Sequence, residues 1–266
     1  MSSPQLRRRR PSHPAGAAAA PAAPEHETSG ERPPAPRTRG AIARAYESRR
    51  ARVLVTAAGG TTAAVLFALL TARVKGRWTT PLDRAVRRPL RRRFRGPKRG
   101  RRRAAVLGAS VVGKLGDTFA YVPAAAAGSY LLHRRGAAGG GALFGAAASV
   151  ALGRHVFRWL FPRFRPPTHL AQWNAFASYP SGHATGSLAV GLTAAHVLAH
   201  EGLVRPLPAL AAALGVTTAV GAARVAKDQH WATDIVGGWL AGIAVASVAT
   251  LAYEARKARD ERRPGR

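Results

Sequence analysis

Long apolar segments alternate with short polar or arginine-rich segments along most of this chain. The clearest covers residues 53–71, which contain 19 residues without a charge and are flanked by arginines on both sides. A helix of this length and composition can span a bilayer. Several later apolar segments have only 15 to 17 residues, and they reach spanning length when their polar ends are included. We predict membrane-spanning helices at 53–71, 118–132, 137–152 (continuing toward residue 161), 184–198, 207–223 and 235–253.

The segments outside these helices are polar or strongly basic. Residues 1–50 are rich in proline, alanine and arginine, which predicts a disordered basic tail. Residues 74–103 hold 14 lysines or arginines and one acid, Asp83. The prolines of that segment predict several short pieces, either lying on an anionic membrane surface or forming a solvated basic loop. Residues 104–117 predict an interfacial helix.

The predicted fold class is therefore all-α. It is a six-transmembrane-helix bundle with an interfacial lead-in helix and a disordered basic N-terminal tail. The predicted domains are the tail at 1–50, the membrane domain at 51–255 and a charged C-terminal tail at 256–266. A soluble all-α protein is the alternative, and the arginine-flanked apolar segments argue against it.

The amino-acid composition limits the kinds of molecule that this protein is expected to bind. The 266 residues include 42 Lys+Arg against 12 Asp+Glu, a formal net charge of +30. Such a charge favours anionic partners, namely nucleic acid, acidic lipid headgroups or phosphates. The apolar segments favour a membrane bilayer with anionic lipids, since a nucleic-acid-binding module does not need them, and no nucleic-acid partner is expected. The absence of cysteine excludes disulfides, thiolate chemistry and cysteine-ligated zinc.

Candidate chemistry is concentrated in residues 224–234. His230 and Asp234 are four residues apart, so they share one face of a helix. A carboxylate beside an imidazole fixes its tautomer and leaves the other ring nitrogen able to attack. Arg224 offers a planar fork suited to phosphate oxygens. The pattern indicates phosphoryl transfer through a histidine, and the alternative is a juxtamembrane salt bridge with a capping histidine.

Two further polar segments border apolar ones. Ser181, Gly182 and His183 lie at a predicted helix N-terminus, where unpaired N–H groups and the helix dipole favour an anion. His183 in that position can protonate a leaving group. Arg158 and Arg165 are seven residues apart and precede a proline turn. The alternatives are an ordinary serine N-cap and an arginine-rich membrane flank.

Taken in order, these three segments resemble the signature motifs of the type 2 phosphatidic acid phosphatase family. That superfamily, of lipid phosphate phosphatases and vanadium haloperoxidases, has the pattern Lys-x6-Arg-Pro, Pro-Ser-Gly-His and Ser-Arg-x5-His-x3-Asp. The spacings within the three motifs match. Two positions depart from the pattern, because Arg158 stands in place of the lysine and Ala223 in place of the serine.

The resemblance implies a membrane-bound, metal-independent phosphatase without a cofactor, acting on a lipid phosphomonoester or diphosphate. Polyprenyl diphosphate, phosphatidate and phosphatidylglycerophosphate are the candidate substrates. It implies a phosphohistidine on His230 oriented by Asp234, with His183 as the proton donor. The implied phosphate ligands are Arg158, Arg165, Ser181, Gly182 and Arg224. The alternatives are a lipid phosphotransferase using the same histidine and a non-enzymatic lipid-binding membrane protein of the same fold.

The order of the predicted helices places all three motifs together. The first two motifs follow the third predicted span and the last motif follows the fifth, so all lie on one membrane face. The resemblance implies a multi-pass plasma-membrane protein with that face extracytoplasmic and both termini cytoplasmic. The first-span flank favours this orientation, whereas the basic segment 74–103 opposes it under the positive-inside rule.

Overall fold

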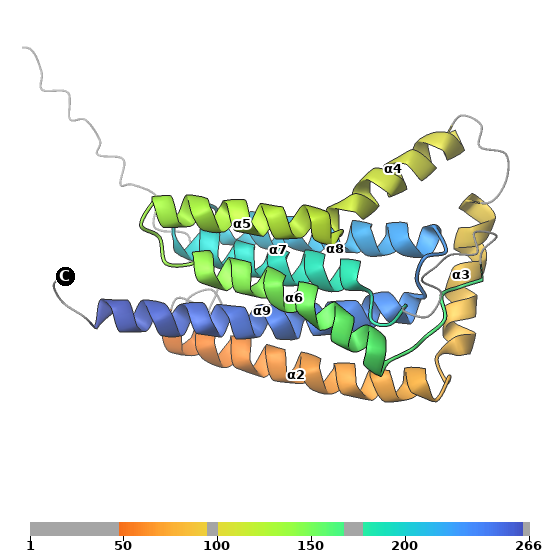
Figure 1. Ribbon diagram of the computed structural model, residues 1–266, viewed down its shortest axis with the longest axis horizontal. Coiled ribbons are helices and arrows are strands. Elements are labelled where there is room, and N and C mark those ends of the chain that lie inside the picture. Colours follow the sequence, from red (N-terminus) through yellow and green to blue (C-terminus); the bar gives the residue numbers. More distant parts are fainter. Residues whose placement is uncertain (1–47, 95–100, 168–177, 263–266) are drawn as a thin grey trace, which may run out of the picture. The chain divides into compact units, whose positions relative to one another are not determined.

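The computed structural model describes residues 48–94, 101–167 and 178–262. Regular secondary structure in these ranges is helical, which confirms the predicted all-α class. Each of the six predicted spans lies within or largely within a helix, and the predicted lead-in segment is also helical (Figure 1). The helices are α2 (Arg49–Lys75), α3 (Thr80–Phe94), α4 (Arg101–Leu115), α5 (Thr118–Arg134), α6 (Gly140–Leu160), α7 (Gly182–His200), α8 (Pro206–Ala226) and α9 (Ala232–Glu261).

Three of the described helices, α2, α8 and α9, are long and apolar enough to cross a membrane. The other predicted spans are shorter or more polar. Helix α5 has 17 residues, α6 carries Arg154 and Arg158, and α7 has His183 in its first turn and ends at His200. The prediction of six spans therefore stays a prediction beyond these three helices.

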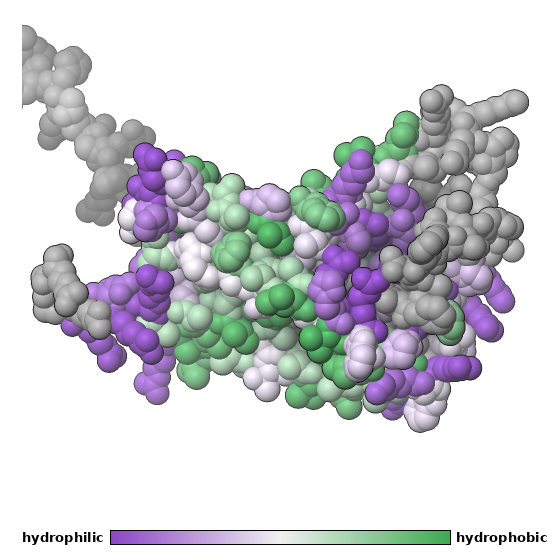
Figure 2. All heavy atoms as spheres, viewed as in Figure 1, coloured by the Kyte–Doolittle hydropathy of each residue, from purple (hydrophilic) through white to green (hydrophobic). Residues whose placement is uncertain are grey.

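Apolar side chains are exposed along the middle of the helices, on a surface that we call the apolar belt. Figure 2 shows hydrophobic residues over the central part of the visible face and hydrophilic residues toward both ends. Leu54, Leu69, Leu152 and Val248 are among the large apolar side chains that are exposed. An exposed, mainly apolar surface between two polar ends suits contact with lipid acyl chains. The protein is a membrane protein by this pattern and by its apolar helices.

The basic segment after α2 contains a helix that the sequence analysis did not predict. Helix α3 has 15 residues, with Pro89 inside it, so the prediction of short pieces is wrong here. Pro81 lies in the first turn, where its missing N–H removes no helical hydrogen bond. Asp83, Arg87 and Leu90 recur at helical spacing and contact the bundle. These contacts hold the segment as one helix across the end of the bundle (Figure 1).

Helices α7 and α9 pack closely because glycines face the partner backbone. A Cβ atom at Gly238 would lie 2.7 Å from the Ser181 carbonyl oxygen, and one at Gly242 would lie 3.0 Å from the Thr185 carbonyl oxygen. At the start of the two helices, the Ser181 N–H donates to the Asp234 carbonyl oxygen at 3.0 Å. This interface therefore sets the relative position of the second and third motifs.

The chain path brings the three motifs to one end of the bundle. Helices α6 and α8 finish there, α7 and α9 begin there, and α3 runs across it (Figure 1). The common end agrees with the order of helices expected from the sequence. At the other end, α9 extends through Glu261, so residues 256–261 of the predicted charged tail are helical. The predicted disordered tail falls mostly on residues 1–47, outside the described ranges.

Candidate active site

His230 lies in the connection between α8 and α9, and its side chain is buried. Its Nδ1 is 2.9 Å from the Ser178 carbonyl oxygen and 3.4 Å from Asp234 Oδ2. Because a carbonyl oxygen only accepts hydrogen bonds, Nδ1 carries the proton and Nε2 keeps its lone pair. Burial lowers the pKa of His230, against the opposing effect of Asp234. The imidazole is therefore neutral near pH 7, with Nε2 as its basic atom.

Asp234 is fully buried in the first turn of α9. Its Oδ2 accepts the Trp231 backbone N–H at 2.9 Å, and its Oδ1 pairs with Arg163 Nη1. The N-terminal end of the helix dipole and the guanidinium both favour a negative charge here. Contacts on both oxygens therefore hold the carboxylate in place beside His230.

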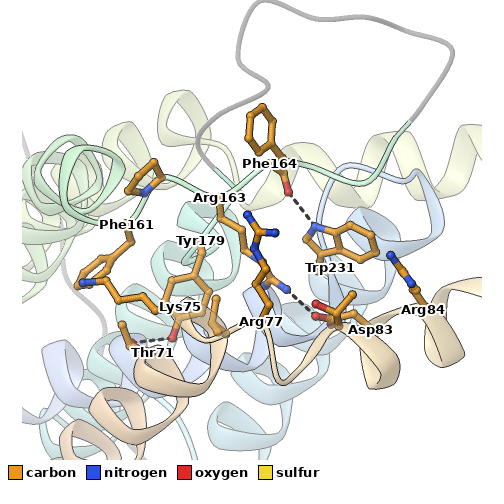
Figure 3. A pocket seen from close by; sticks show the side chains of 13 residues that line it. Thr71, Lys75, Arg77, Asp83, Arg84, Phe161, Arg163, Phe164, Tyr179 and Trp231 are labelled. Atoms are coloured by element: carbon orange, nitrogen blue, oxygen red, sulfur yellow. Dashed lines mark hydrogen bonds and ion pairs between the residues drawn. The ribbon is translucent and has the colours of Figure 1, made fainter.

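Arg163 joins Asp234 to a second buried carboxylate, Asp83 of α3. Its Nη2 lies 2.6 Å from Asp83 Oδ2, and the Asp83 side chain is only 1 % exposed (Figure 3). Asp83 also accepts hydrogen bonds from the Thr233 backbone N–H at 2.9 Å and from the Thr233 hydroxyl at 2.8 Å. Buried carboxylates need a compensating cation, and one guanidinium serves both. Helix α3 is thereby connected to the start of α9.

Two of the predicted phosphate ligands meet at Gln229. Arg165 Nη1 donates to its backbone oxygen at 2.7 Å, and Arg224 Nη1 donates to its Oε1 at 2.7 Å. Arg224 Nη2 donates to the Gly113 carbonyl oxygen at 2.6 Å. The remaining Arg224 nitrogen, Nε, is buried and has no hydrogen-bond partner among the described residues. An unpaired buried donor is costly, and a phosphate oxygen would satisfy it.

His183 lies in the first turn of α7, with its ring centroid 6.3 Å from that of His230. Its Nε2 is also buried without a hydrogen-bond partner among the described residues. Arg224, Arg154 and Arg165 act on His183 electrostatically, which places their charges near its ring. Two nitrogen atoms without a hydrogen-bond partner in the described ranges, Arg224 Nε and His183 Nε2, thus lie in the same region as His230.

The structure places the other predicted phosphate ligands around this region in different ways. Arg158 lies in the last turn of α6 and acts on Arg165 electrostatically. Ser181 is the buried N-cap of α7, and its hydroxyl oxygen accepts a backbone N–H of the first turn at 3.5 Å. At Gly182 an added Cβ would have Arg154 Cβ as its nearest neighbour, at 4.0 Å. The roles of these residues toward phosphate remain predictions.

Several residues of this region were not among the predicted site residues. Asp83 could have been noticed, because it is the one acid in a segment of 14 cations. Arg163 lies inside the first motif, but the basic positions of that motif are Arg158 and Arg165, so Arg163 was not predicted as a site residue. Ser178 contributes a backbone oxygen, for which no side-chain pattern exists. Gln229 precedes His230 and had no expected role.

A pocket of about 570 Å³ lies beside the Asp83–Arg163 pair (Figure 3). Its walls come from the end of α2, the start of α3, the chain that follows α6, and Tyr179 and Trp231. The lining residues include neither His230 nor Arg224. The pocket therefore adjoins the predicted phosphate site, with Arg163 and Trp231 between the pocket and Asp234.

One group of described residues, at the other end of α7, has the spacing of metal ligands. The ligand atoms of His196, His200 and Glu254 lie within 4.8 Å of one another. Glu254 Oε1 lies 3.0 Å from His196 Nε2 and 3.0 Å from Arg52 Nε. The arginine already compensates the buried carboxylate, so charge balance at this group does not call for a metal ion.

Two comparisons with known proteins find similarities. Residues 138–258 match the model of the PAP2 superfamily. The fold is similar to the crystal structure of a transmembrane PAP2-type phosphatidylglycerolphosphate phosphatase from Bacillus subtilis, with a TM-score of 0.59 and 20% sequence identity. That similarity covers 78% of this chain and 98% of the other, and at this identity it concerns the fold. A comparison with curated proteins gives no match. Residues 138–258 contain all three motifs, so the part of the chain that carries them is similar to the PAP2 superfamily.

Proposed function

We propose that this protein is an integral membrane phosphatase that hydrolyses a phosphomonoester or diphosphate of a lipid through a phosphohistidine on His230. The observation that carries the proposal is the fixed tautomer of His230, whose Nδ1 donates to Ser178 and leaves Nε2 basic. The match of residues 138–258 to the PAP2 superfamily model and the fold shared with a phosphatidylglycerolphosphate phosphatase support a lipid phosphate as substrate.

The proposed reaction has two steps. In the first, His230 Nε2 attacks phosphorus, the bond from phosphorus to the leaving oxygen breaks, and His183 donates its proton to that oxygen. In the second, His183 takes a proton from water, the water oxygen attacks phosphorus, and the phosphorus–nitrogen bond breaks. Inorganic phosphate leaves and His230 is restored. The groups proposed to hold the phosphate are Arg158, Arg165, Ser181, Gly182 and Arg224.

The arginines supply the positive charge that this reaction requires. Negative charge on the equatorial phosphoryl oxygens is stabilised by donors that are already in place. Arg224 is held by Gln229 and Gly113, and within the described part of the chain its Nε has no partner, so the side chain is oriented before substrate binds. On this proposal the enzyme needs no metal ion.

The test is phosphate release by the detergent-purified full chain from a panel of lipids. The panel contains a polyprenyl diphosphate, phosphatidate and phosphatidylglycerophosphate, and we expect hydrolysis of at least one. His230→Ala should abolish release, whereas His196→Ala, a histidine far from the site, should retain it. Activity should persist in EDTA. A folded protein that releases phosphate from no lipid would overturn the proposal, as would an EDTA-inactivated enzyme rescued by Mg²⁺. Loss of lipid phosphate without free phosphate would instead identify a phosphotransferase.

A further inference from the structure

The pocket beside Arg163 has a charge that the proposed reaction does not use. Four cationic side chains and one carboxylate line it. Arg163 and the carboxylate of Asp83 are paired with each other at 2.6 Å. The three remaining cations, Lys75, Arg77 and Arg84, form no ion pair with any described residue. The pocket is therefore strongly positive, and such a concave surface attracts anions.

The backbone at Arg77 is held in an unusual conformation. Its φ is 59°, in the left-handed region that non-glycine residues rarely adopt. The turn that follows α2 is fixed by hydrogen bonds from the Arg77 N–H to the Val74 carbonyl and from the Trp78 N–H to the Arg73 carbonyl. A non-glycine residue here costs about 1 kcal/mol or more. An arginine that lines the pocket in spite of this cost suggests a use for its side chain.

The lining of the pocket also includes apolar residues. Val74, Phe161, Pro162 and Phe164 contribute to its walls, and Lys75 Nζ lies 5.1 Å from the centre of the Phe161 ring. Helix α2 leads from the pocket into the apolar belt, where large side chains such as Leu69 are exposed (Figure 2). A ligand that fits both surfaces has an anionic head and an acyl tail.

The floor of the pocket is polar but already satisfied. The Thr71 hydroxyl lies 2.9 Å from the Tyr179 hydroxyl, and both side chains are buried (Figure 3). Thr80, in the first turn of α3, adds a hydroxyl to the lining. A volume of about 570 Å³ falls within the range of small-molecule sites and accommodates a phospholipid headgroup.

We propose that this pocket binds the phosphate headgroup of an anionic glycerophospholipid, with Arg77 and Arg84 as its main charged contacts and the acyl chains along α2. The site is separate from the catalytic one, because Arg163 and Trp231 lie between the pocket and Asp234. A lipid held there contacts the same arginine that pairs with Asp234. The proposal concerns binding alone and does not depend on catalysis.

The test is calorimetric titration of the detergent-solubilised full chain carrying His230→Ala, so that turnover does not affect the result. The ligands are a short-chain phosphatidylglycerol, the phosphatidylcholine with the same acyl chains, and inorganic phosphate. We expect one saturable site for phosphatidylglycerol, and binding of the other two that is at least about tenfold weaker. Binding should also weaken as salt is added.

Three double variants locate the site. Arg77→Gly with Arg84→Ala should weaken phosphatidylglycerol binding at least about tenfold. Glycine suits the left-handed backbone at position 77, so this change should not impair folding. The matched control, Arg134→Ala with Arg205→Ala, removes two exposed arginines at the other end of the bundle and should leave binding unchanged. Arg77→Lys with Arg84→Lys, which keeps both charges, should retain most of the affinity.

Three results would overturn the proposal. If Arg165→Ala with Arg224→Ala abolishes binding and the pocket variant does not, the lipid occupies the catalytic site. If phosphate alone binds as tightly as phosphatidylglycerol and is lost with the pocket variant, the site recognises free phosphate rather than lipid. If phosphatidylcholine binds equally well, the headgroup charge plays no part.

Discussion

At the scale of single residues, the orientation of His230 depends on a row of buried and partly buried charges. His230 contacts Asp234, Asp234 pairs with Arg163, and Arg163 pairs with Asp83. Burial keeps water from screening these charges, so each strongly influences its neighbour. Asp83 does not reach the imidazole, and we therefore expect it to act through Arg163 as a positioning residue.

Asp83→Asn should lower kcat about tenfold, or ~1.4 kcal/mol, with little change in KM. The asparagine amide N–H₂ group cannot accept a hydrogen bond, yet it must face donors on Arg163 or Thr233. Arg163 also loses one of the two carboxylates with which it pairs. The control is Asp228→Asn, which breaks the Arg87 tether of the same helix without touching Arg163. Steady-state phosphate release from both purified variants provides the measurement. An equal fall in kcat for the two variants would show that docking of α3, and not Arg163, is responsible.

The buried state of His230 predicts the acid side of the pH profile. The nucleophile acts as the neutral imidazole, and burial lowers its pKa below the ordinary value of about 6.5. The neutral form is then retained as pH falls through 6.5 and is lost only at lower pH. The acid limb of kcat/KM should therefore lie below pH 6.5. Asp234→Asn removes a charge that raises this pKa, so residual activity should show a limb at still lower pH. A wild-type limb at or above 6.5 would contradict the prediction.

At the scale of helices, two interfaces place the site residues. Helix α3 is docked by Asp83, Arg87 and Leu90, which recur on one face. Helices α7 and α9 approach closely at Gly238, beside the hydrogen bond from Ser181 to Asp234. A change at this second interface should separate the second motif from the third.

Gly238→Ala should lower both stability and activity. Its Cβ would lie 2.7 Å from the Ser181 carbonyl oxygen and 2.9 Å from Ala184 Cβ, so α7 must shift. Overpacking of this kind costs about 1–3 kcal/mol. Gly145→Ala is the matched control, because an added Cβ there has no neighbour within 4 Å. Thermal unfolding in detergent and phosphate release give the two readouts. A Gly238→Ala protein as stable as the control would mean that the interface relaxes easily.

At the scale of the whole molecule, the apolar belt separates a polar end that carries the motifs from a polar end that carries Glu254 and its arginine partners. Both ends are basic, so charge alone does not decide which faces the cytoplasm. Helix α3 and its exposed arginines lie at the motif end. We expect that end to be extracytoplasmic, with both termini in the cytoplasm.

Single cysteines test this orientation, because the chain has none of its own. Arg88 on α3, Arg135 after α5 and Arg259 near the end of α9 are exposed positions. In intact cells, a membrane-impermeant thiol reagent should label position 88 and leave 135 and 259 unlabelled until the membrane is opened. Labelling at 135 and 259 alone would place the active site in the cytoplasm.

The sequence by itself determined the helices and the main chemical groups. Helical hydrogen bonds join residues only four apart, so helix formation depends mainly on the local sequence. Apolar segments and their polar ends therefore indicate where most helices form. The same local spacing places His230 and Asp234 together, and the three motifs identify both histidines and the arginines around them. The prediction of short pieces in the basic segment was wrong because it rested on the prolines alone. The contacts of Asp83, Arg87 and Leu90 that hold the helix are with residues far along the chain, which a local pattern does not show.

Only the tertiary structure decided which contacts fix the site. Arg163 lies between two carboxylates that are 151 positions apart in the chain, at Asp83 and Asp234. The tautomer of His230 depends on a backbone oxygen of Ser178, and a backbone oxygen has no residue type that a sequence pattern can detect. The cationic pocket likewise combines the end of α2, the start of α3 and the chain after α6. Such features arise because packing brings distant segments together, and no local period encodes that packing.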